Sequence, residues 1–458
     1  MYRPLILVVS GLLQAALFAQ APNSGIRTPI AAIPAVQTLI ALAKENNPEL
    51  AVAQSRSHAE HARVGPSGAL PDPEISFAVQ KGPQRDAIIT GANGVDASNL
   101  FGVLPGMTEY SMSLGQGIPW PGKLAARESV AHQSVKRSEL GIYETTLALE
   151  ADVLTSCLEL LVTLARRELF ASQLSYWSAT EEIAKAGLDQ GESSASDVIQ
   201  AMREQSRLKL RLLEIDNQIQ DQKDILNQLA VRDQDSPIEL GASILELELP
   251  KPPEENELLE DLKTRNSEWL GSIVDIKSAD ASVRFAKMDR FPDFRVGAGV
   301  AKAGSMPVAW RTEVGVTLPI WSERKQNKMV ARAQAERHSA ESAQNSLALV
   351  LATKSRERAR AWKLSDVTVK LYENELIPQG EATLAILKAR FQNGGASFAS
   401  IVEALNALLR DQEKRLDAIA QIHNYAILQH RASLDAVSAS SRKTNKSGSP
   451  GMDNDANF

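Results

Sequence analysis

Gln116-Gly-Ile-Pro-Trp-Pro-Gly-Lys123 separates two kinds of sequence, and this boundary decides the fold. Before it, Tyr110, Met112 and Leu114 alternate with serine and glycine, which is typical of a half-buried β-strand. After it, no proline occurs up to Gly187 and leucines recur at heptad spacing, which predicts one helix of about 65 residues. Proline lacks the N–H that a ladder or a helix interior needs, but it suits a first helical turn. The stretch is therefore predicted to be a strand-to-helix elbow.

Residues 22–231 are predicted to form a first repeat around this elbow. Its elements are expected in this order: a helix over 36–64 interrupted near Pro48, a strand at 75–79, a long loop over 81–107, a strand at 109–117, the long helix to about Gly187, and a second helix to about Ala230. Ser194 followed by Asp197 resembles a capping box at the start of that second helix, so the two helices form a hairpin.

A second repeat is predicted over 257–436, after a proline-rich connector at 232–256. Asn266-Ser-Glu-Trp-Leu270 echoes Asn47-Pro-Glu-Leu50, and Phe291-Pro-Asp-Phe294 echoes Leu70-Pro-Asp-Pro73. A second elbow at 317–323 leads into another helix of about 65 residues, which is expected to bend at Pro378. A final helix is expected to run to about Leu434.

The strand near 308–318 is predicted to have two different faces. One face carries Val308, Trp310, Val314, Val316 and Leu318, and the other carries Arg311, Glu313 and Thr317. Trp310, like Trp120 and Trp321 at the elbows, lies where an aromatic interfacial belt would place it, and packing within the elbow is the alternative for Trp120 and Trp321.

The ends and the composition of the chain limit its function. Residues 1–21 read as a signal peptide, with an apolar run and an Ala19-Gln-Ala21 cleavage site, and residues 437–458 are expected to be a disordered tail. Cys157 is the only cysteine, so an intrachain disulfide is excluded and a packing role is expected. The net charge of −6 argues against nucleic acid as a partner.

The predicted fold class is mainly α with a small β part, built from long antiparallel α-hairpins in tandem repeat and four strands per chain. Past the signal, no uncharged run of 18 apolar residues occurs, and four strands are too few to close a membrane barrel alone. Three chains would supply twelve strands, and heptad stripes on the hairpins would be covered by neighbouring hairpins.

The doubled order of strand, strand, Ile-Pro-Trp-Pro-Gly-Lys elbow and long hairpin resembles the TolC-like outer-membrane efflux proteins over residues 36–435. The stretch from Gln116 to Leu124 resembles the heavy-metal branch of that family. The resemblance implies a homotrimer with a 12-stranded barrel in the lipid of the cell outer membrane and a helical tunnel through the periplasm. Its implied partners are a periplasmic adaptor protein and an inner-membrane pump of the resistance-nodulation-division type. It implies a passive duct without catalysis or cofactor.

The hairpin tips match the positions at which the family meets its adaptor. These positions are Gly187, Leu188, Gly191 and Ser194 in the first tip, and Arg390, Gly394, Gly395 and Ser397 in the second. A helix hairpin needs glycine for its turn and serine for its cap in any case, so a purely structural role is the alternative.

Three acidic residues, Asp189, Glu192 and Asp197, gather at the first tip. With threefold symmetry they would form carboxylate rings that select or retard cations, and the alternative is a solvated helix start that complements the dipole. The barrel-to-tunnel elbows are assigned to Pro119, Trp120, Pro121, Gly122, Pro319 and Trp321.

Histidine pairs at His58 and His61, and at His423 and His430, share helix faces but lack further ligands, so no metal site is expected. No nucleophile with its base and no phosphate-binding loop is present in the sequence, so no enzyme activity is expected.

The resemblance implies an exit duct of a tripartite efflux pump, with heavy-metal cations as its expected cargo. Drug efflux or type I secretion by the same architecture is the alternative within this class. A soluble periplasmic coiled-coil scaffold is the alternative from a different class. A membrane strand needs about 9–11 residues with an outward apolar row, so the strand faces discriminate between a duct and a scaffold.

Overall fold

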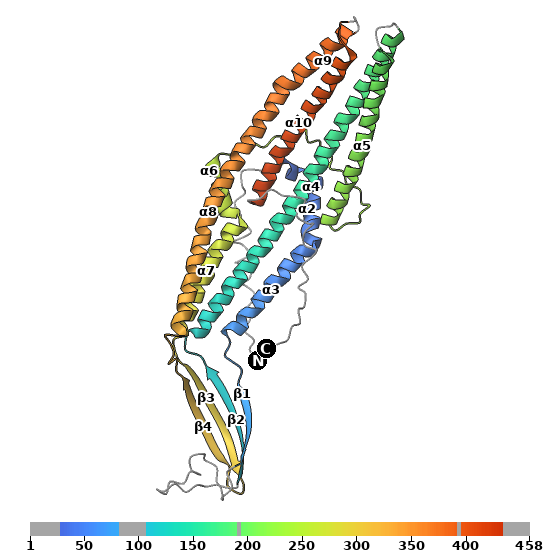
Figure 1. The fold of residues 1–458 in the computed structure, drawn as a ribbon. Coiled ribbons are helices and arrows are strands. Elements are labelled where there is room, and N and C mark those ends of the chain that lie inside the picture. Colours follow the sequence, from blue (N-terminus) through green and yellow to red (C-terminus); the bar gives the residue numbers. More distant parts are fainter. Residues whose placement is uncertain (1–27, 82–106, 190–193, 392–394, 434–458) are drawn as a thin grey trace, which may run out of the picture. The chain divides into compact units, whose positions relative to one another are not determined.

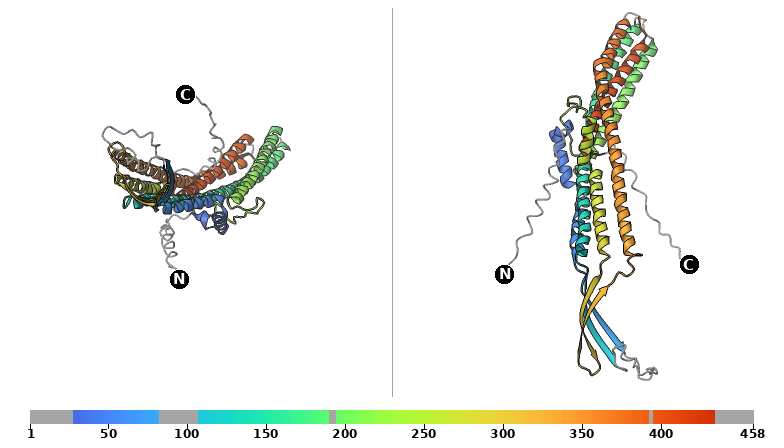
Figure 2. Two further views of the ribbon diagram at one scale, coloured as in Figure 1. Left: turned by 90° about the horizontal axis from the view of Figure 1, so that it is seen from below. Right: turned by 90° about the vertical axis from the view of Figure 1, so that its left-hand side faces the viewer.

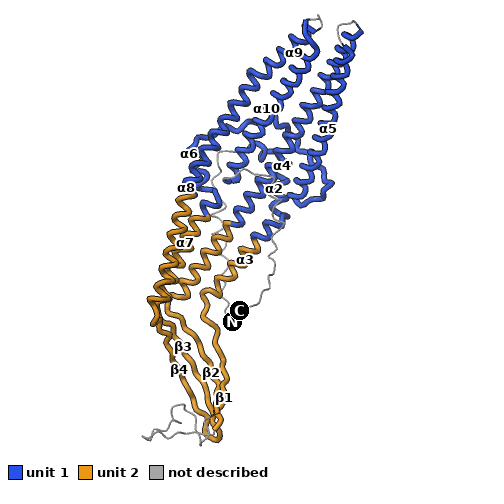
Figure 3. Tube along the Cα trace, in the orientation of Figure 1, with its two compact units in different colours: residues 1–53, 141–270, 347–458 blue, residues 54–140, 271–346 orange. Residues whose placement is uncertain are grey.

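The structure is a computed structural model, and it describes residues 28–81, 107–189, 194–391 and 395–433. The chain divides into two compact units, which are coloured separately in Figure 3. Unit 1 comprises 1–53, 141–270 and 347–458, and unit 2 comprises 54–140 and 271–346. The signal peptide, most of the 81–107 loop and the C-terminal tail expected from the sequence lie outside the described residues.

The described elements follow one another in the order that the doubled layout predicts (Figure 1). In chain order they are η1 (Pro29–Ala32), α2 (Pro34–Asn46), α3 (Pro48–Gly68), β1 (Glu74–Lys81), β2 (Thr108–Ile118), α4 (Lys123–Asp189), α5 (Ala195–Leu229), α6 (Glu255–Arg265), α7 (Ser267–Met288), β3 (Asp293–Ala303), β4 (Ala309–Thr317), α8 (Gln326–Leu371), η4 (Tyr372–Leu376), α9 (Ile377–Phe391) and α10 (Phe398–Arg431).

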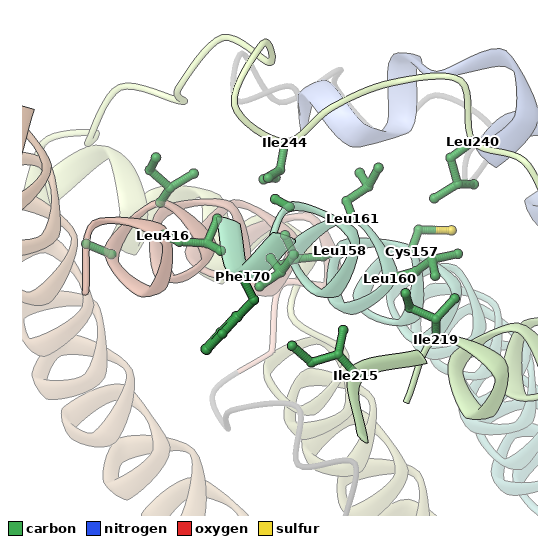
Figure 4. Packing of buried hydrophobic residues seen from close by; sticks show 14 of the residues in the cluster. Cys157, Leu158, Leu160, Leu161, Phe170, Ile215, Ile219, Leu240, Ile244 and Leu416 are labelled. Atoms are coloured by element: carbon green, nitrogen blue, oxygen red, sulfur yellow. The ribbon is translucent and has the colours of Figure 1, made fainter. Parts of the chain in front are cut away.

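The core of unit 1 forms around the apolar stripe of α4. Leu154, Leu161 and Cys157 are fully buried there and pack with Ile215 and Ile219 of α5 (Figure 4). Burial raises the pKa of the Cys157 thiol to about 12, so this cysteine is an unreactive packing residue. Two leucines of the heptad stripe expected from the sequence, Leu154 and Leu161, therefore lie in the core that α4 shares with α5.

The proline-rich connector is more than a link between the repeats. Ile238, Leu240 and Ile244 are buried in the same core, and Figure 4 shows Leu240 and Ile244 lying over α4. Each buried aliphatic side chain of this size contributes about 1.5–3 kcal/mol. The connector thus covers part of the apolar surface of α4.

Two details of the helices differ from the expectations. α4 ends at Asp189, slightly beyond the expected end near Gly187, and Gly187 itself is buried in the last turn of the helix. The bend expected at Pro378 is a five-residue π-helical turn, η4, placed just before it. Because proline has no N–H to donate, the ladder changes register there, and the N–H of Ile377 bonds to the carbonyl of Tyr372.

The four strands of unit 2 form one antiparallel sheet in the order β1-β2-β3-β4, which Figure 2 shows from the side (right panel). The register pairs Phe77 with Met112, Met112 with Val300 and Val300 with Trp310. The outer edges of β1 and β4 have no strand beside them within the described residues. None of the described helices is long and apolar enough to cross a membrane.

Candidate functional site

One face of the sheet in unit 2 is a continuous apolar surface exposed to solvent. Trp310 is 84% exposed, Val314 77% and Phe77 74%. Cross-strand pairing places on this same face the apolar residues Ile75, Phe77, Val79, Tyr110, Met112, Leu114, Ile118, Phe294, Val296, Ala298, Val300, Trp310, Val314 and Val316. The strand predicted from the alternation of Tyr110, Met112 and Leu114 is present, but these side chains are exposed and not half-buried, because none of the described residues covers their side of the sheet.

The opposite face carries small and charged side chains. Arg295 lies 3.5 Å from Glu74, and Arg311 lies 3.6 Å from Glu109. Between these ion pairs, the face carries mainly serine, glycine and alanine, with Glu313 on β4. At Gly299 an added Cβ would lie 2.7 Å from the carbonyl of Met112. The two-sided pattern predicted for 308–318 is confirmed and extends over the whole sheet.

The first elbow is packed against the turn that precedes β3. Trp120 stacks on Phe291 at 5.2 Å and on Phe294 at 5.7 Å between ring centroids. Gly122 has a φ of +90°, a conformation that other residues rarely adopt, and it turns the chain into α4. Trp120 thus packs against the turn before β3, an arrangement that agrees with the elbow-packing alternative.

An ion pair that the sequence analysis did not single out fixes the same elbow. Lys123 is 5% exposed, and its Nζ donates to Asp293 Oδ1 at 2.9 Å and Oδ2 at 3.1 Å. Asp293 Oδ1 also accepts from the backbone N–H of Trp120 at 3.0 Å. The sequence pattern contains both partners of this ion pair: the lysine lies in the elbow, and the aspartate lies in the repeated Phe291–Phe294 motif.

The second elbow has no corresponding packing within the described chain. Trp321 is 69% exposed, and Leu318 and Ile320 are exposed as well. The neighbouring Arg324 and Lys325 take part in no ion pair among the described residues. The two elbows, equivalent in sequence position, therefore differ in environment.

The first hairpin tip is described on both sides of residues 190–193, so Gly191 and Glu192 lie outside the described residues. The predicted capping box is confirmed: Asp197 N–H donates to Ser194 Oγ at 3.3 Å, and Ser194 N–H donates to Asp197 Oδ2 at 2.9 Å. Asp189 and Leu188 are exposed at the end of α4. Asp197 thus completes the capping box of α5, whereas Asp189 is an exposed residue at the end of α4.

The second tip closes differently, and its Gly394 also lies outside the described residues. Gly395 N–H donates to the carbonyl of Arg390 at 2.8 Å, which satisfies a carbonyl at the end of α9. Ser397 caps α10 through Ser400 N–H at 3.3 Å, without a carboxylate in return. Phe391 and Phe398 make an edge contact at 6.0 Å beneath the turn.

The histidines of the two pairs have different surroundings. His61 contacts Glu139 at 3.2 Å and His430 contacts Glu150 at 2.7 Å, while His423 is buried with neither ring nitrogen partnered among the described residues. Burial lowers the pKa of His423 to about 4. No group of three or more potential ligand side chains gathers within the described part of the chain.

A buried polar network at the end of α10 was not foreseen. Arg265 donates to the carbonyls of Gln429 and His430 at 2.7 and 3.1 Å, and Arg358 donates to the carbonyl of Ser433 at 2.5 Å. Burial raises the pKa of Glu150 there, but hydrogen bonds from His430 and Lys44 outweigh it and lower that pKa overall. Scattered single charges along five helices give no sequence signal for such a network.

Comparisons with known proteins agree with this geometry. Residues 39–230 match the family described as outer membrane efflux protein. No curated protein sequence matches the chain.

Solved structures with the same fold cover most of the chain. CusC superimposes with a TM-score of 0.69 at 15% identity, covering 86% of this chain and 91% of that chain. The outer membrane protein VceC from Vibrio cholerae gives 0.68 at 17% identity, covering 87% and 96%. The MtrE outer membrane channel of Neisseria gonorrhoeae, in its open state, gives 0.65 at 18% identity, covering 87% and 89%. At these identities the likeness establishes the fold.

Proposed function

We propose that this protein is the outer-membrane exit duct of a tripartite efflux pump. Residues 39–230 match the model of the outer membrane efflux protein family, and the fold is similar to that of solved outer-membrane channels, which supports the proposal. It is a passive channel without catalytic residues. It lies in the outer membrane and continues into the periplasm, where an adaptor protein and an inner-membrane pump of the resistance-nodulation-division type join it.

The observation that carries this proposal is the exposed apolar face of the sheet. β2 and β3 have 11 residues each and β4 has nine, which are lengths that suit a tilted strand crossing lipid. All four strands present their apolar side chains outward and their charges on the opposite face. A soluble scaffold would have to bury such a face against other protein, whereas in a membrane the lipid keeps these apolar side chains out of water.

Closure of the barrel requires other copies of the chain, because β1 and β4 are edge strands and an open edge is not tolerated in lipid. Three chains together supply twelve strands. Within one chain, the ion pair between Lys123 and Asp293 joins the β2 elbow to the turn before β3. In the repeat, the β4 elbow is the counterpart of the β2 elbow, and the turn before β1 is the counterpart of the turn before β3. The exposed β4 elbow therefore packs against the turn before β1 of the next chain, where Asp72 corresponds to Asp293.

The hairpin tips are proposed as the adaptor-docking ends. Gly191 and Gly394 match the family positions at the two turns, and Leu188 is exposed beside the first. Replacing both glycines with bulky residues is expected to abolish pump-dependent resistance while trimers still reach the outer membrane. Unchanged resistance would show that the tips are only structural turns.

The proposed cargo is heavy-metal cations, and it is supported by the resemblance of the Gln116–Leu124 elbow to the heavy-metal branch. Multidrug efflux and type I secretion use the same architecture, because a duct accepts what its pump delivers. Co-expression with a metal pump and with a drug pump in a duct-deficient host separates these cases. Restored metal tolerance alone supports the metal assignment, and restored drug tolerance alone overturns it.

The function itself is tested by fractionation of two matched variants. Val314→Arg places a charge on the outward face, and Glu313→Arg places the same side chain on the opposite face one residue away. The wild type and Glu313→Arg are expected in outer membranes as a heat-modifiable trimer. Val314→Arg is expected to fall about tenfold or more in that fraction, because arginine at mid-membrane costs about 2–4 kcal/mol. A wild type that stays in the soluble periplasmic fraction would establish the scaffold alternative.

A further inference from the structure

The charged residues of the sheet are distributed unequally between its two faces. The carboxylates of the four strands, those of Glu74, Glu109, Asp293 and Glu313, all lie on the face opposite the apolar surface. Both arginines lie there too, each within 4 Å of a glutamate. Along these strands the apolar face carries two charges, Lys81 and Lys302, and both are positive.

The two lysines lie at the same end of the sheet, which is the end remote from the elbows. Lys81 is paired with Thr108, and Lys302 is paired with Tyr110, one step further along β2. From the spacing between strands and the rise per residue, the Cα atoms of Lys81 and Lys302 are about 12 Å apart. Neither lysine takes part in an ion pair or hydrogen bond among the described residues, and both are exposed.

Two exposed aromatic residues accompany the lysines on the same face. Tyr110 lies between the lysine-bearing strands and is 62% exposed, and Trp310 lies on β4 opposite Val300. Tyrosine and tryptophan favour the boundary between hydrocarbon and headgroups, and lysine reaches that boundary along its apolar stem. We name Lys81, Tyr110, Lys302 and Trp310 the basic rim.

The other end of the apolar face has no such charges. It ends at Ile118, Phe294 and Val316, beside the elbows. A lysine is strongly disfavoured in the middle of a membrane, but it is tolerated near the interface. The position of both lysines at one end therefore marks a single membrane boundary, where their ammonium groups are at headgroup level.

We propose that the basic rim binds the phosphate groups of anionic lipids at the membrane boundary remote from the elbows. The inference rests on the proposed function, since the apolar face must lie in a bilayer. Two unpaired ammonium groups, with no carboxylate on their face of the strands, complement a phosphorylated headgroup, while Tyr110 and Trp310 hold the adjoining acyl and glycerol region. An acidic protein partner would leave the apolar surface between the lysines uncovered, whereas lipid covers it.

The test uses the full chain extracted with mixed micelles that contain phosphatidylglycerol and phosphatidylcholine, and native mass spectrometry counts the retained lipids. Lys81→Gln with Lys302→Gln removes the rim charges. Arg295→Gln with Arg311→Gln removes two positive charges from the opposite face and serves as the matched control. The double lysine variant is expected to lose its preference for phosphatidylglycerol by about tenfold or more, since each basic residue near a membrane surface contributes about 1 kcal/mol, and the arginine control is expected to keep it.

Three outcomes would overturn the inference. The lysine variant could retain phosphatidylglycerol as the wild type does, the arginine control could lose it equally, or excess inorganic phosphate could displace the lipid, which would indicate a phosphate site that does not need lipid. Fractionation of the same variants separates this inference from the proposed function. A wild type absent from outer membranes defeats both, whereas a wild type in outer membranes without lipid preference defeats the rim alone.

Discussion

Asn266 donates a hydrogen bond of 2.7 Å from Nδ2 to the carbonyl of Ala432, the capping residue that directly follows α10. Its Oδ1 accepts at 2.8 Å from the backbone N–H of Trp269, so the same side chain caps α7. Asn47, its counterpart in the first repeat, donates to the carbonyl of Leu229 at 3.4 Å at the end of α5. In each repeat, one asparagine thus joins a break between two short helices to the end of the hairpin.

This relationship predicts unequal costs for two equivalent substitutions. Asn266 is buried and Asn47 is half-buried with a longer bond, so Asn266→Ala should lower the free energy of unfolding by about 1–3 kcal/mol and Asn47→Ala by less. Asn266→Asp keeps the acceptor for Trp269 and loses the donor to Ala432, which separates the two contributions. Denaturant titration in detergent measures all three. An equal or larger loss for Asn47→Ala would contradict the assignment.

The first elbow predicts coupling between Lys123 and Asp293. Lys123 is buried and bonds both carboxylate oxygens, while Asp293 also receives the N–H of Trp120. In a double-mutant cycle, Lys123→Met and Asp293→Asn should be non-additive by about 0.5–3 kcal/mol. The cycle is measured by the same denaturant titration. Strict additivity would mean that the contact does not stabilise the elbow.

His423 predicts a loss of stability in acid. Its folded pKa is lowered by burial to about 4, against about 6.5 in the unfolded chain. Between these values the unfolded chain binds more protons, so stability is complete above about 6.5 and falls by at most about 3 kcal/mol as the pH drops towards 4.

The His423→Leu variant isolates this contribution. The slope of unfolding free energy against pH between 4 and 6.5 should become flatter in His423→Leu, and it should stay unchanged in His58→Gln, where the histidine is exposed on α3. If the slope of unfolding free energy against pH in His423→Leu equals that of the wild type, His423 is not the cause of the acid sensitivity.

The acidic residues of the first tip are expected to contribute to cation selectivity, and the variants that test this must keep the capping box intact. Asp197→Ala would break the box as well as remove a charge, so Asp197→Gln is the better variant because glutamine can also complete the box. Asp189→Asn with Asp197→Gln should lower cation selectivity in single-channel recordings. Unchanged selectivity would leave these carboxylates as a solvated helix start.

Much of the fold could be predicted because strong local signals agree with each other. The change of period at Pro119 and Pro121 marks the end of β2, and the capping box at Ser194 marks the start of α5. The repeat of the elbow then predicts the second half. These features depend on neighbouring residues in the chain, so a single sequence carries them.

Other features could not be predicted because they depend on distant contacts. Ile238, Leu240 and Ile244 lie in a proline-rich connector whose composition indicates a loop, and their burial depends on the α4 surface they cover. Whether an alternating strand is buried depends on whether another layer lies on it, and no pattern within residues 108–118 records that. The buried arginines at the end of α10 likewise bind backbone carbonyls, which every residue has.

A disulfide between chains tests whether several copies of the chain close one barrel. In a Cys157→Ser background, Asp72→Cys and Arg324→Cys place thiols on the turn before β1 and on the β4 elbow. Within one chain these positions lie at opposite edges of the sheet, about 14 Å apart by strand spacing, beyond the reach of a disulfide. Oxidation of cells should yield covalent trimers in the outer membrane that dithiothreitol reduces to monomers. Monomers alone, with outer-membrane protein present, would contradict the account.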